Sequence, residues 1–247
     1  MIWNGRILAA LVVWMAALVS VTASAAELRV MAAGSLKDAF TNWRVLTCAA
    51  VNFCAIIGSV GLGLWMPQII RGFGFGVATV GFLAAIPYIC GAVAMMLWAR
   101  LSDKGGERSW FVASALLVGA VALVVCGYAT SSALISMLAL CGAVVGIMCY
   151  QSTFWPIPSS FLTGSAAAGG IAMIVSIGNL GGFVGPYLIG VIRQTTDSFS
   201  WALISLAAFL TLAAILIRMV GVSLQRQVGA AVNRTSPTAN LSKGIGR

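Results

Sequence analysis

Six polar or aromatic side chains stand inside long apolar segments of this sequence. They are Asn52, Tyr150, Gln151, Ser152, Trp155 and Asn179. Amides, hydroxyls and an indole N–H at such positions can form hydrogen bonds with a solute, or they can bond to a neighbouring helix, and both roles stay open. No nucleophile–base pair, phosphate-binding loop or cluster of metal ligands accompanies them. We therefore expect no enzyme activity, no metal and no cofactor.

The elements that position these side chains are predicted from hydropathy. Of the 247 residues, 61% are hydrophobic and only 8% are charged, whereas a soluble domain has about 25% charged residues. A helix needs about 20 apolar residues to cross a bilayer, and six windows of this length follow residue 43. We predict an all-α integral membrane protein whose six-helix bundle occupies residues 44–220, with spans at 45–69, 78–99, 110–129, 133–155, 167–192 and 199–219.

Charged residues stand mainly at the ends of these spans, and the net charge is +9. Loops rich in Lys and Arg stay in the cytoplasm, so Arg100, Lys104, Arg108 and the basic C-terminal segment predict a cytoplasmic C-terminus in a bacterial inner membrane. The basic residues form no face interleaved with aromatic residues, so we expect no nucleic-acid partner. The polar composition of residues 221–247 predicts a disordered basic tail. The cysteines are expected to be packing residues: Cys48, Cys54, Cys90, Cys126, Cys141 and Cys149.

The first 25 residues have the pattern of a secretory signal peptide. Arg6 precedes an apolar run at 7–21, and Ala23-Ser24-Ala25 has the form of a cleavage site; an uncleaved membrane anchor is the alternative. A signal peptide would export the residues that follow it and would invert every later span. This placement conflicts with the one that the basic residues predict. We therefore expect a junction between two unrelated segments within "DAFTNWRVL".

The stretch "AELRVMAAGSLKDAF" at 26–40 resembles the mature start of a periplasmic molybdate-type substrate-binding protein of an ABC transporter. In that family the turn serine, here Ser35, helps to hold the oxyanion. The resemblance covers about 15 residues and a two-lobed binding protein needs about two hundred more. Residues 26–43 are therefore interpreted as a remnant, and an ABC-type solute-binding component is the least favoured function.

The body of the chain resembles the C-terminal six-helix half of a major facilitator superfamily transporter, in the anion:cation symporter branch of phthalate, tartrate and glucarate permeases. Three stretches carry the resemblance: "WARLSDKGGERSW" at 98–110, "FWPIPSSFLTGSAAAGGIA" at 154–172 and "SIGNLGGFVGPYLIG" at 176–190. Together with the six spans, the likeness extends over more than two thirds of the sequence.

The resemblance also implies roles for particular residues. The loop between the second and third spans would act as a gate, with Asp103 as the acidic partner of Arg100, Lys104 and Arg108; a solvated loop that only sets topology is the alternative. Ser152 and Trp155 match a Ser and a Trp that contact sugar-acid substrates in that branch. An Asn twenty residues after the Trp commonly completes the family's site, and this chain has Val175 there.

The fifth span is rich in glycine. Gly178 and Gly182, and likewise Gly181 and Gly185, have the small-xxx-small spacing that lets membrane helices approach closely. Packing is the favoured interpretation of these residues. Pro186 in the same span predicts a kink, and interrupted helices often border transport sites.

The expected function is a truncated or chimeric transporter of small organic anions such as carboxylates and sugar acids. Its spans contain no charged group at their centres, so it is expected to be inactive alone. Transport would require a second six-helix half or a homodimer, because alternating access needs two bundles. The expected partners are membrane lipid and a small organic anion. A membrane-embedded accessory or interaction protein is the alternative.

Overall fold

The computed structural model describes residues 41–129 and 132–235, and the secondary structure over these residues is helical. Within this part of the chain, six helices are long and apolar enough to cross a membrane: α2 (Trp43–Arg71), α3 (Val77–Lys104), α4 (Arg108–Tyr128), α5 (Ala133–Phe154), α7 (Ser165–Thr196) and α8 (Phe199–Thr235). The short helix α6 (Pro156–Phe161) links α5 to α7. The predicted all-α bundle of six spans is confirmed, whereas the predictions for residues 1–25 and nearly all of 26–43 lie outside the described residues.

Several helix ends extend further than hydropathy predicted. Helices α3 and α4 leave only residues 105–107 between them, because Gly105 caps α3 and Gly106 adopts a φ of +71° that reverses the chain. Helix α8 continues to Thr235, so the expectation of disorder does not hold for residues 221–235. The residues of this extension include Gln, Leu, Arg and Ala, which are good helix formers. Its first turns are also held to α2, because Ser223 and Gln227 accept hydrogen bonds from Arg44.

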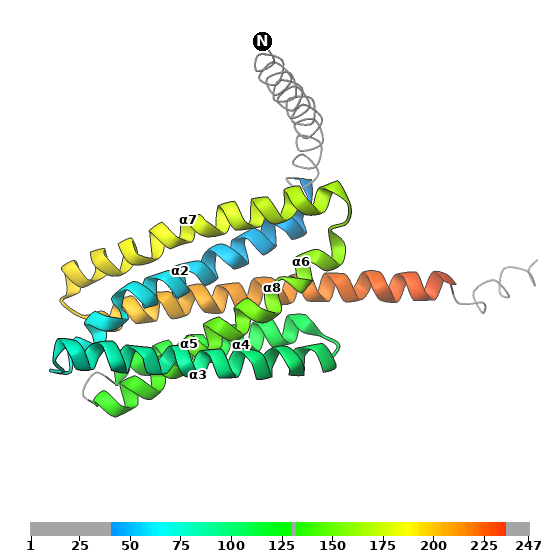
Figure 1. Ribbon diagram of the computed structural model, residues 1–247. Helices are drawn as coiled ribbons and strands as arrows, with labels where there is room; N and C mark the ends of the chain where they lie inside the picture. The colour runs from blue at the N-terminus through cyan, green and yellow to red at the C-terminus, as the bar shows by residue number, and fades with distance from the viewer. Residues whose placement is uncertain (1–40, 130–131, 236–247) are drawn as a thin grey trace, which may run out of the picture.

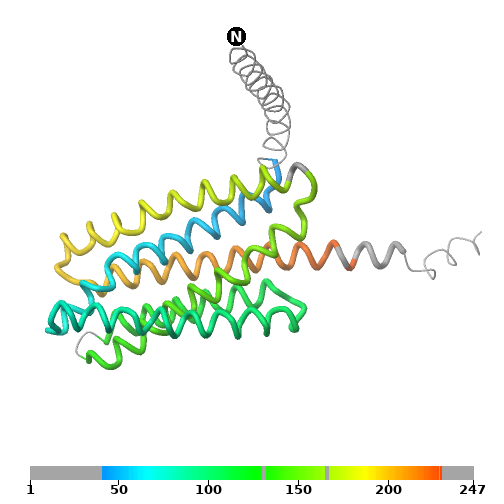
Figure 2. Tube along the Cα trace, viewed as in Figure 1, coloured from blue at the N-terminus to red at the C-terminus, as the bar shows by residue number. Residues whose placement is uncertain are grey.

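The helices follow one another across the bundle in an order different from that of the chain. Helix α7 packs mainly on α2, α2 also packs on α8, and α8 packs on α4. Helix α4 then packs on α5, and α5 on α3. Figure 1 shows α7 and α2 along one edge, α8 through the middle and α3, α4 and α5 along the other, and the trace in Figure 2 follows the same path. Segments at opposite ends of the sequence therefore share the centre of the bundle.

Glycines of α7 allow its backbone to approach α2. A Cβ added to Gly181 would meet the carbonyl oxygen of Phe53, and one added to Gly185 would meet that of Ile57. A Cβ on Gly182 would lie 3.8 Å from the nearest side-chain atoms, an ordinary contact. Side chains are therefore excluded more strictly at Gly181 and Gly185 than at Gly182. Helix α7 continues as one element through Pro186, whose carbonyl accepts a hydrogen bond of 3.2 Å from Trp65 Nε1.

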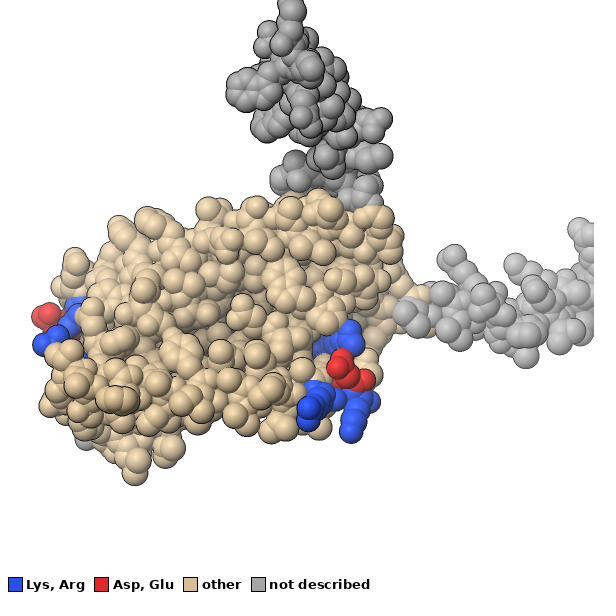
Figure 3. Space-filling model, viewed as in Figure 1, with Lys and Arg blue, Asp and Glu red and all other residues tan. Residues whose placement is uncertain are grey.

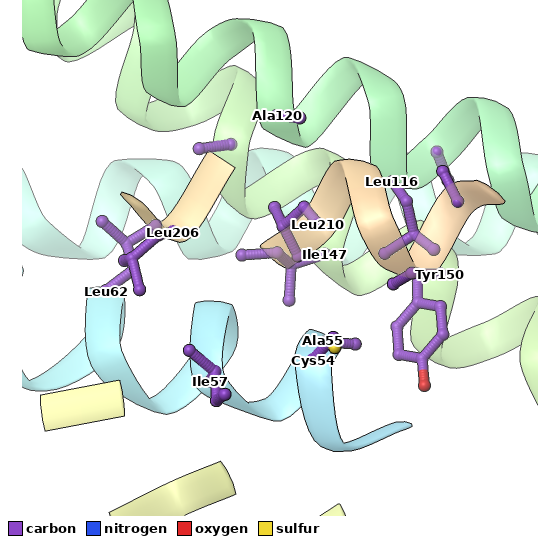
Figure 4. Close-up of a cluster of buried hydrophobic side chains, with 14 of the residues drawn as sticks. Cys54, Ala55, Ile57, Leu62, Leu116, Ala120, Ile147, Tyr150, Leu206 and Leu210 are labelled. Carbon is purple, nitrogen blue, oxygen red and sulfur yellow. The ribbon is translucent and has the colours of Figure 1, made fainter. Parts of the chain in front are cut away.

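Apolar side chains fill the space between α2, α4, α5 and α8. Leu210 of α8 lies at the centre of this core and is fully buried. The methyl groups of Leu210 lie over Gly58 of α2 and Gly119 of α4, two positions where a glycine admits the larger side chain. Figure 4 shows Leu210 beside Leu116, Ile147 and Leu206, with the hydroxyl of Tyr150 directed away from this apolar cluster.

The outer surface of the bundle is as apolar as its interior. Helix α3 has only 17% of its most hydrophobic window buried and exposes Phe82 and Ile89. Such exposure has little cost in a membrane, where lipid tails are as apolar as leucine. Lys, Arg, Asp and Glu gather at the two ends of the molecule in Figure 3, and the central band of this face carries none. Among the cysteines, Cys90 is exposed on α3, which differs from the expected packing role, while Cys48, Cys54, Cys126 and Cys149 are buried.

Substituting Gly185 with Ala should destabilise the protein, whereas the same change at Gly182 should leave stability unchanged. The added methyl group at residue 185 meets backbone that cannot move aside, and overpacking of this kind costs about 1–3 kcal/mol. Thermal unfolding of the two variants in one detergent checks the difference. Equal melting temperatures for Gly185→Ala and Gly182→Ala would contradict the proposed close contact.

Candidate functional site

The carboxamide of Asn52 connects three helices at the centre of the bundle. Its Nδ2 donates a hydrogen bond of 3.2 Å to the carbonyl of Ile174 in α7, and its Oδ1 accepts one of 3.0 Å from the Tyr150 hydroxyl in α5. Asn52 is 5% exposed and Tyr150 is 4% exposed. The amide occupies the space above Gly178, where a side chain would collide with it. Asn52 and Tyr150 are thus held by interhelical hydrogen bonds, the alternative that the sequence left open.

A small polar pocket lies beside this hydrogen-bonded pair. Its volume is about 140 Å³, and α2, α5 and α7 enclose it together with Trp155. Five of the six candidate residues from the sequence line it: Asn52, Tyr150, Gln151, Trp155 and Asn179. The remaining walls come from Ala55, Ile56, Ser59, Ile147 and Val175. Residues separated by more than a hundred positions therefore meet at one site.

Three of the pocket residues have hydrogen-bonding groups that other side chains leave unused. Within residues 41–129 and 132–235, the carboxamides of Gln151 and Asn179 and the indole N–H of Trp155 make no side-chain hydrogen bond. Gln151 and Asn179 are both exposed. The Trp155 ring is fixed by an edge-to-face contact with Phe154, with ring centroids 5.3 Å apart. The pocket therefore has the hydrogen-bonded pair of Asn52 and Tyr150 at its floor and neutral donors without side-chain partners at its rim.

Two details of the site differ from the sequence-based expectation. Ser152 does not line the pocket, and its hydroxyl donates to the carbonyl of Cys149 on its own helix, at 2.9 Å. Ser59 lines the pocket and was missed, because a single serine in an apolar span gives little signal. Val175 lines the wall where the resemblance expects an Asn, so this position contributes an apolar surface instead of an amide.

The predicted gating loop forms an ion pair at one end of the bundle. Arg108 Nη2 lies 2.9 Å from Asp103 Oδ1 across the turn made by Gly105 and Gly106. Both partners are largely exposed, and exposed pairs contribute little to stability. Arg100 and Lys104 extend from the last turns of α3 toward the same end and are exposed.

A second, less exposed pair joins this loop to α8 and was not predicted. Arg218 Nη1 donates to both Glu107 Oε1 and Ser109 Oγ, and its guanidinium lies 3.9 Å from the centroid of the Trp110 ring. The hydrogen bond from Arg218 is the main cause that lowers the pKa of Glu107 below its ordinary value. Glu107 and Arg218 both stand near span ends in the sequence, but only the fold shows that α4 and α8 are neighbours.

Arg44 fixes the start of α2 to α8 at this same end. Its guanidinium donates to Ser223 Oγ at 2.7 Å and to Gln227 Oε1 at 2.7 Å. The start of α2, the loop between α3 and α4 and the later turns of α8 therefore share one side of the membrane bundle, as the predicted number of spans requires. At the opposite end, Arg193 bonds to Gln68 and covers the Phe199 ring at 4.5 Å.

A bundle of six membrane-length helices with a polar pocket between them defines a multi-pass membrane protein of the helical transporter class. The chain belongs to the Major Facilitator Superfamily, whose family model matches residues 48–243. It is accordingly a member of a transporter family and not an enzyme.

Several curated proteins are similar to this chain. A protein of Agrobacterium vitis named "Putative tartrate transporter" is 45% identical over 197 residues, which are 80% of this chain and 44% of the relative. The "Quinolone resistance transporter" of Acinetobacter baumannii is 37% identical over 78% of this chain and 45% of its own length. The "Inner membrane transport protein RhmT" of Escherichia coli is 31% identical over 74% of this chain and 42% of its own length.

The chain spans less than half of the length of each of these relatives. The family match begins at residue 48. It gives no support to the resemblance of residues 26–40 to a molybdate-binding protein, and these residues lie outside the described structure.

Asn52 and Tyr150 should be energetically coupled. A double-mutant cycle with Asn52→Ala, Tyr150→Phe and the double variant should give a coupling of about 0.6 kcal/mol, the average for hydrogen bonds between membrane helices, with an upper value of about 1.7 kcal/mol. Unfolding free energies in mixed micelles provide the measurement. Additive effects would show that the 3.0 Å contact between the two side chains carries no net stability.

Stability should fall in acid through Glu107. Because the pKa of Glu107 is lowered from 4.5 in the folded protein, its pair with Arg218 contributes stability above pH 4.5 and loses it as the pH falls through the lowered pKa. Glu107→Gln should reduce this loss, and thermal unfolding between neutral and acidic pH checks it. Asp103→Asn, which removes the exposed pair, is the matched control. The assignment would be contradicted if Asp103→Asn reduced the loss of stability in acid and Glu107→Gln did not.

Proposed function

We propose that the bundle is the C-terminal half of a transporter for small organic anions, carboxylates or sugar acids, and that the pocket beside Asn52 forms its share of the substrate site. The observation that supports this function most directly is the set of unused donors on Gln151, Trp155 and Asn179 around one small pocket. Carboxylate and hydroxyl oxygens accept hydrogen bonds from such groups. In this proposal Asn52 and Tyr150 hold the helices around the pocket together and are not the main contacts of the solute.

The pocket is too small and too neutral to hold an anion alone. Its volume of about 140 Å³ lies below the roughly 300–1,000 Å³ typical of ligand sites. The spans offer no cationic group at this depth, and a buried charge needs a partner. We propose that a second six-helix bundle from a companion chain supplies the opposite wall and the charge, and that this bundle does not transport alone.

The relatives support the solute class but differ among themselves. The Agrobacterium vitis relative carries the name of tartrate, a small dicarboxylate with hydroxyl groups that would suit the neutral donors of the pocket. The Acinetobacter baumannii relative carries the name of quinolone resistance. Val175 gives this pocket an apolar surface at the position where the resemblance to the carboxylate branch leads us to expect an Asn. A test of function therefore needs both kinds of solute.

We also propose that the protein lies in a bacterial inner membrane with its C-terminus in the cytoplasm. One end of the bundle has Arg44, Arg100, Lys104, Arg108, Arg218 and Arg226 with two acidic residues, Asp103 and Glu107. The other end has Arg71 and Arg193 with Asp197. The excess of basic residues favours the first end as cytoplasmic. The Asp103–Arg108 turn at that end would then be the gate.

Uptake measurements in cells lacking related permeases test the proposal. Cells that make this chain alone should accumulate no labelled tartrate, and cells that also make the unmatched remainder of the Agrobacterium vitis relative should accumulate it. In the paired cells Gln151→Ala and Trp155→Ala should each reduce uptake by about fivefold or more, since a lost polar contact in a desolvated site costs about 1–3 kcal/mol. Ser152→Ala is the matched control, because its hydroxyl bonds to its own helix.

The alternatives give different results in the same cells. Uptake by this chain alone would contradict the need for a second half. Uptake that depends on Ser152 and not on Gln151 would contradict the proposed pocket. If neither kind of cell transports tartrate or a quinolone, and the chain purifies with a second membrane protein in fixed proportion, the accessory function is favoured instead.

A further inference from the structure

A long groove lies on the outer face between α4 and α8, away from the polar pocket. Its volume is about 660 Å³, in the range of ligand sites. One bank carries Trp110, Ala113 and Leu117, spaced as one stripe of α4. The other bank carries the corresponding stripe of α8: Ile215, Met219, Val222 and Arg226. Ala214 and Arg218 complete the lining.

The groove is apolar along most of its length and basic at one end. Its aliphatic residues lie toward the membrane centre, whereas Arg218 and Arg226 lie in the α8 turns that reach the basic end of the bundle. Trp110 stands at this end and is 53% exposed, with the Arg218 guanidinium against its ring. Exposed tryptophans are enriched at the level of lipid headgroups. An apolar trough with basic groups at the headgroup level matches both parts of one phospholipid molecule.

The two arginines at the end of the groove have different partners. Arg218 uses its Nη1 on Glu107 and Ser109 and is only partly neutralised by that carboxylate. Arg226 is exposed and has no hydrogen-bond or ion-pair partner among the described residues. Ser223 and Gln227, on a neighbouring face of α8 outside the groove, accept hydrogen bonds from Arg44, so that face is already occupied. The groove end therefore has an excess positive charge that faces the membrane surface.

We propose that this groove binds an anionic phospholipid, with one acyl chain along Leu117, Ile215 and Met219 and the phosphate at Arg226 and Arg218. A second copy of the chain is a poorer occupant. A symmetric contact through this face would bring the same basic ends together, with Arg226 near Arg226, and like charges repel at low dielectric. A zwitterionic lipid would fill the trough but would leave the excess positive charge without an anionic partner. The inference does not depend on the proposed transport function.

Native mass spectrometry of the full-length protein in detergent tests this site, with phosphatidylglycerol and phosphatidylcholine of identical acyl chains in competition. The wild type should retain phosphatidylglycerol in preference. Arg226→Gln should reduce that preference by about fivefold, because each basic group near an anionic surface contributes about 1 kcal/mol. Arg71→Gln removes the same charge at the opposite end and is the matched control, with an expected change within about twofold. Val222→Trp, which fills the trough without changing charge, should reduce retention of both lipids.

The same spectra contain the outcomes that would overturn the proposal. No preference for phosphatidylglycerol in the wild type would do so, and so would an equal loss in Arg71→Gln and Arg226→Gln. A dimer that disappears in Val222→Trp would show that a second copy covers the groove. Thermal unfolding of each variant shows whether it remains folded, and Val222→Trp and Arg226→Gln give independent tests because one changes shape and the other changes charge.

Discussion

The position of α7 depends on the amide of Asn52. Helix α7 makes most of its contacts with α2, and these contacts require backbone against backbone at Gly181 and Gly185. Asn52 occupies the next step of this interface, above Gly178, and donates a side-chain hydrogen bond from α2 to the α7 backbone. The same amide accepts from Tyr150, so α5 is tied to the pair. The pocket exists because these three helices are held at this separation.

The absence of charged residues at the centres of the described spans determines which polar groups the site contains. A bilayer makes a central charge costly, so the described bundle has its charged groups at its two ends and neutral donors at its middle. Buried polar side-chain atoms within the described residues all have hydrogen-bond partners, which leaves only the groups at the pocket rim for a solute. Gln151, Trp155 and Asn179 can orient oxygen atoms but cannot neutralise an anion. In the proposed transporter, the complementary charge would therefore come from the second bundle.

Hydropathy predicted the spans because each of the six helices is apolar over a length that matches the bilayer. Hydropathy did not predict the helix ends. Gly106 sets a tight turn after α3, and Arg44 donates hydrogen bonds to Ser223 and Gln227 in the extended part of α8. The polarity of Asn52, Gln151 and Asn179 in apolar spans was enough to nominate them. Sequence alone could not distinguish Asn52, which bonds between helices, from Gln151, which does not. That distinction depends on which helices are neighbours, as does the pair between Glu107 and Arg218.

The two sides of the bundle face different surroundings, and the central helices separate them. Helix α8 contributes Leu206 and Leu210 to the core between α2 and α4, while its outer stripe with Met219 and Arg226 lines the groove. Because the polar pocket uses α2, α5 and α7, no residue belongs to both sites. The face with free amide donors suits contact with a solute and a second bundle, and the face with an apolar trough suits lipid. A lipid at the groove would contact Arg218, which also holds Glu107 beside the Asp103–Arg108 turn. An anionic headgroup there would compete with Glu107 for the same guanidinium, and this competition physically connects the lipid surface to the loop between α3 and α4.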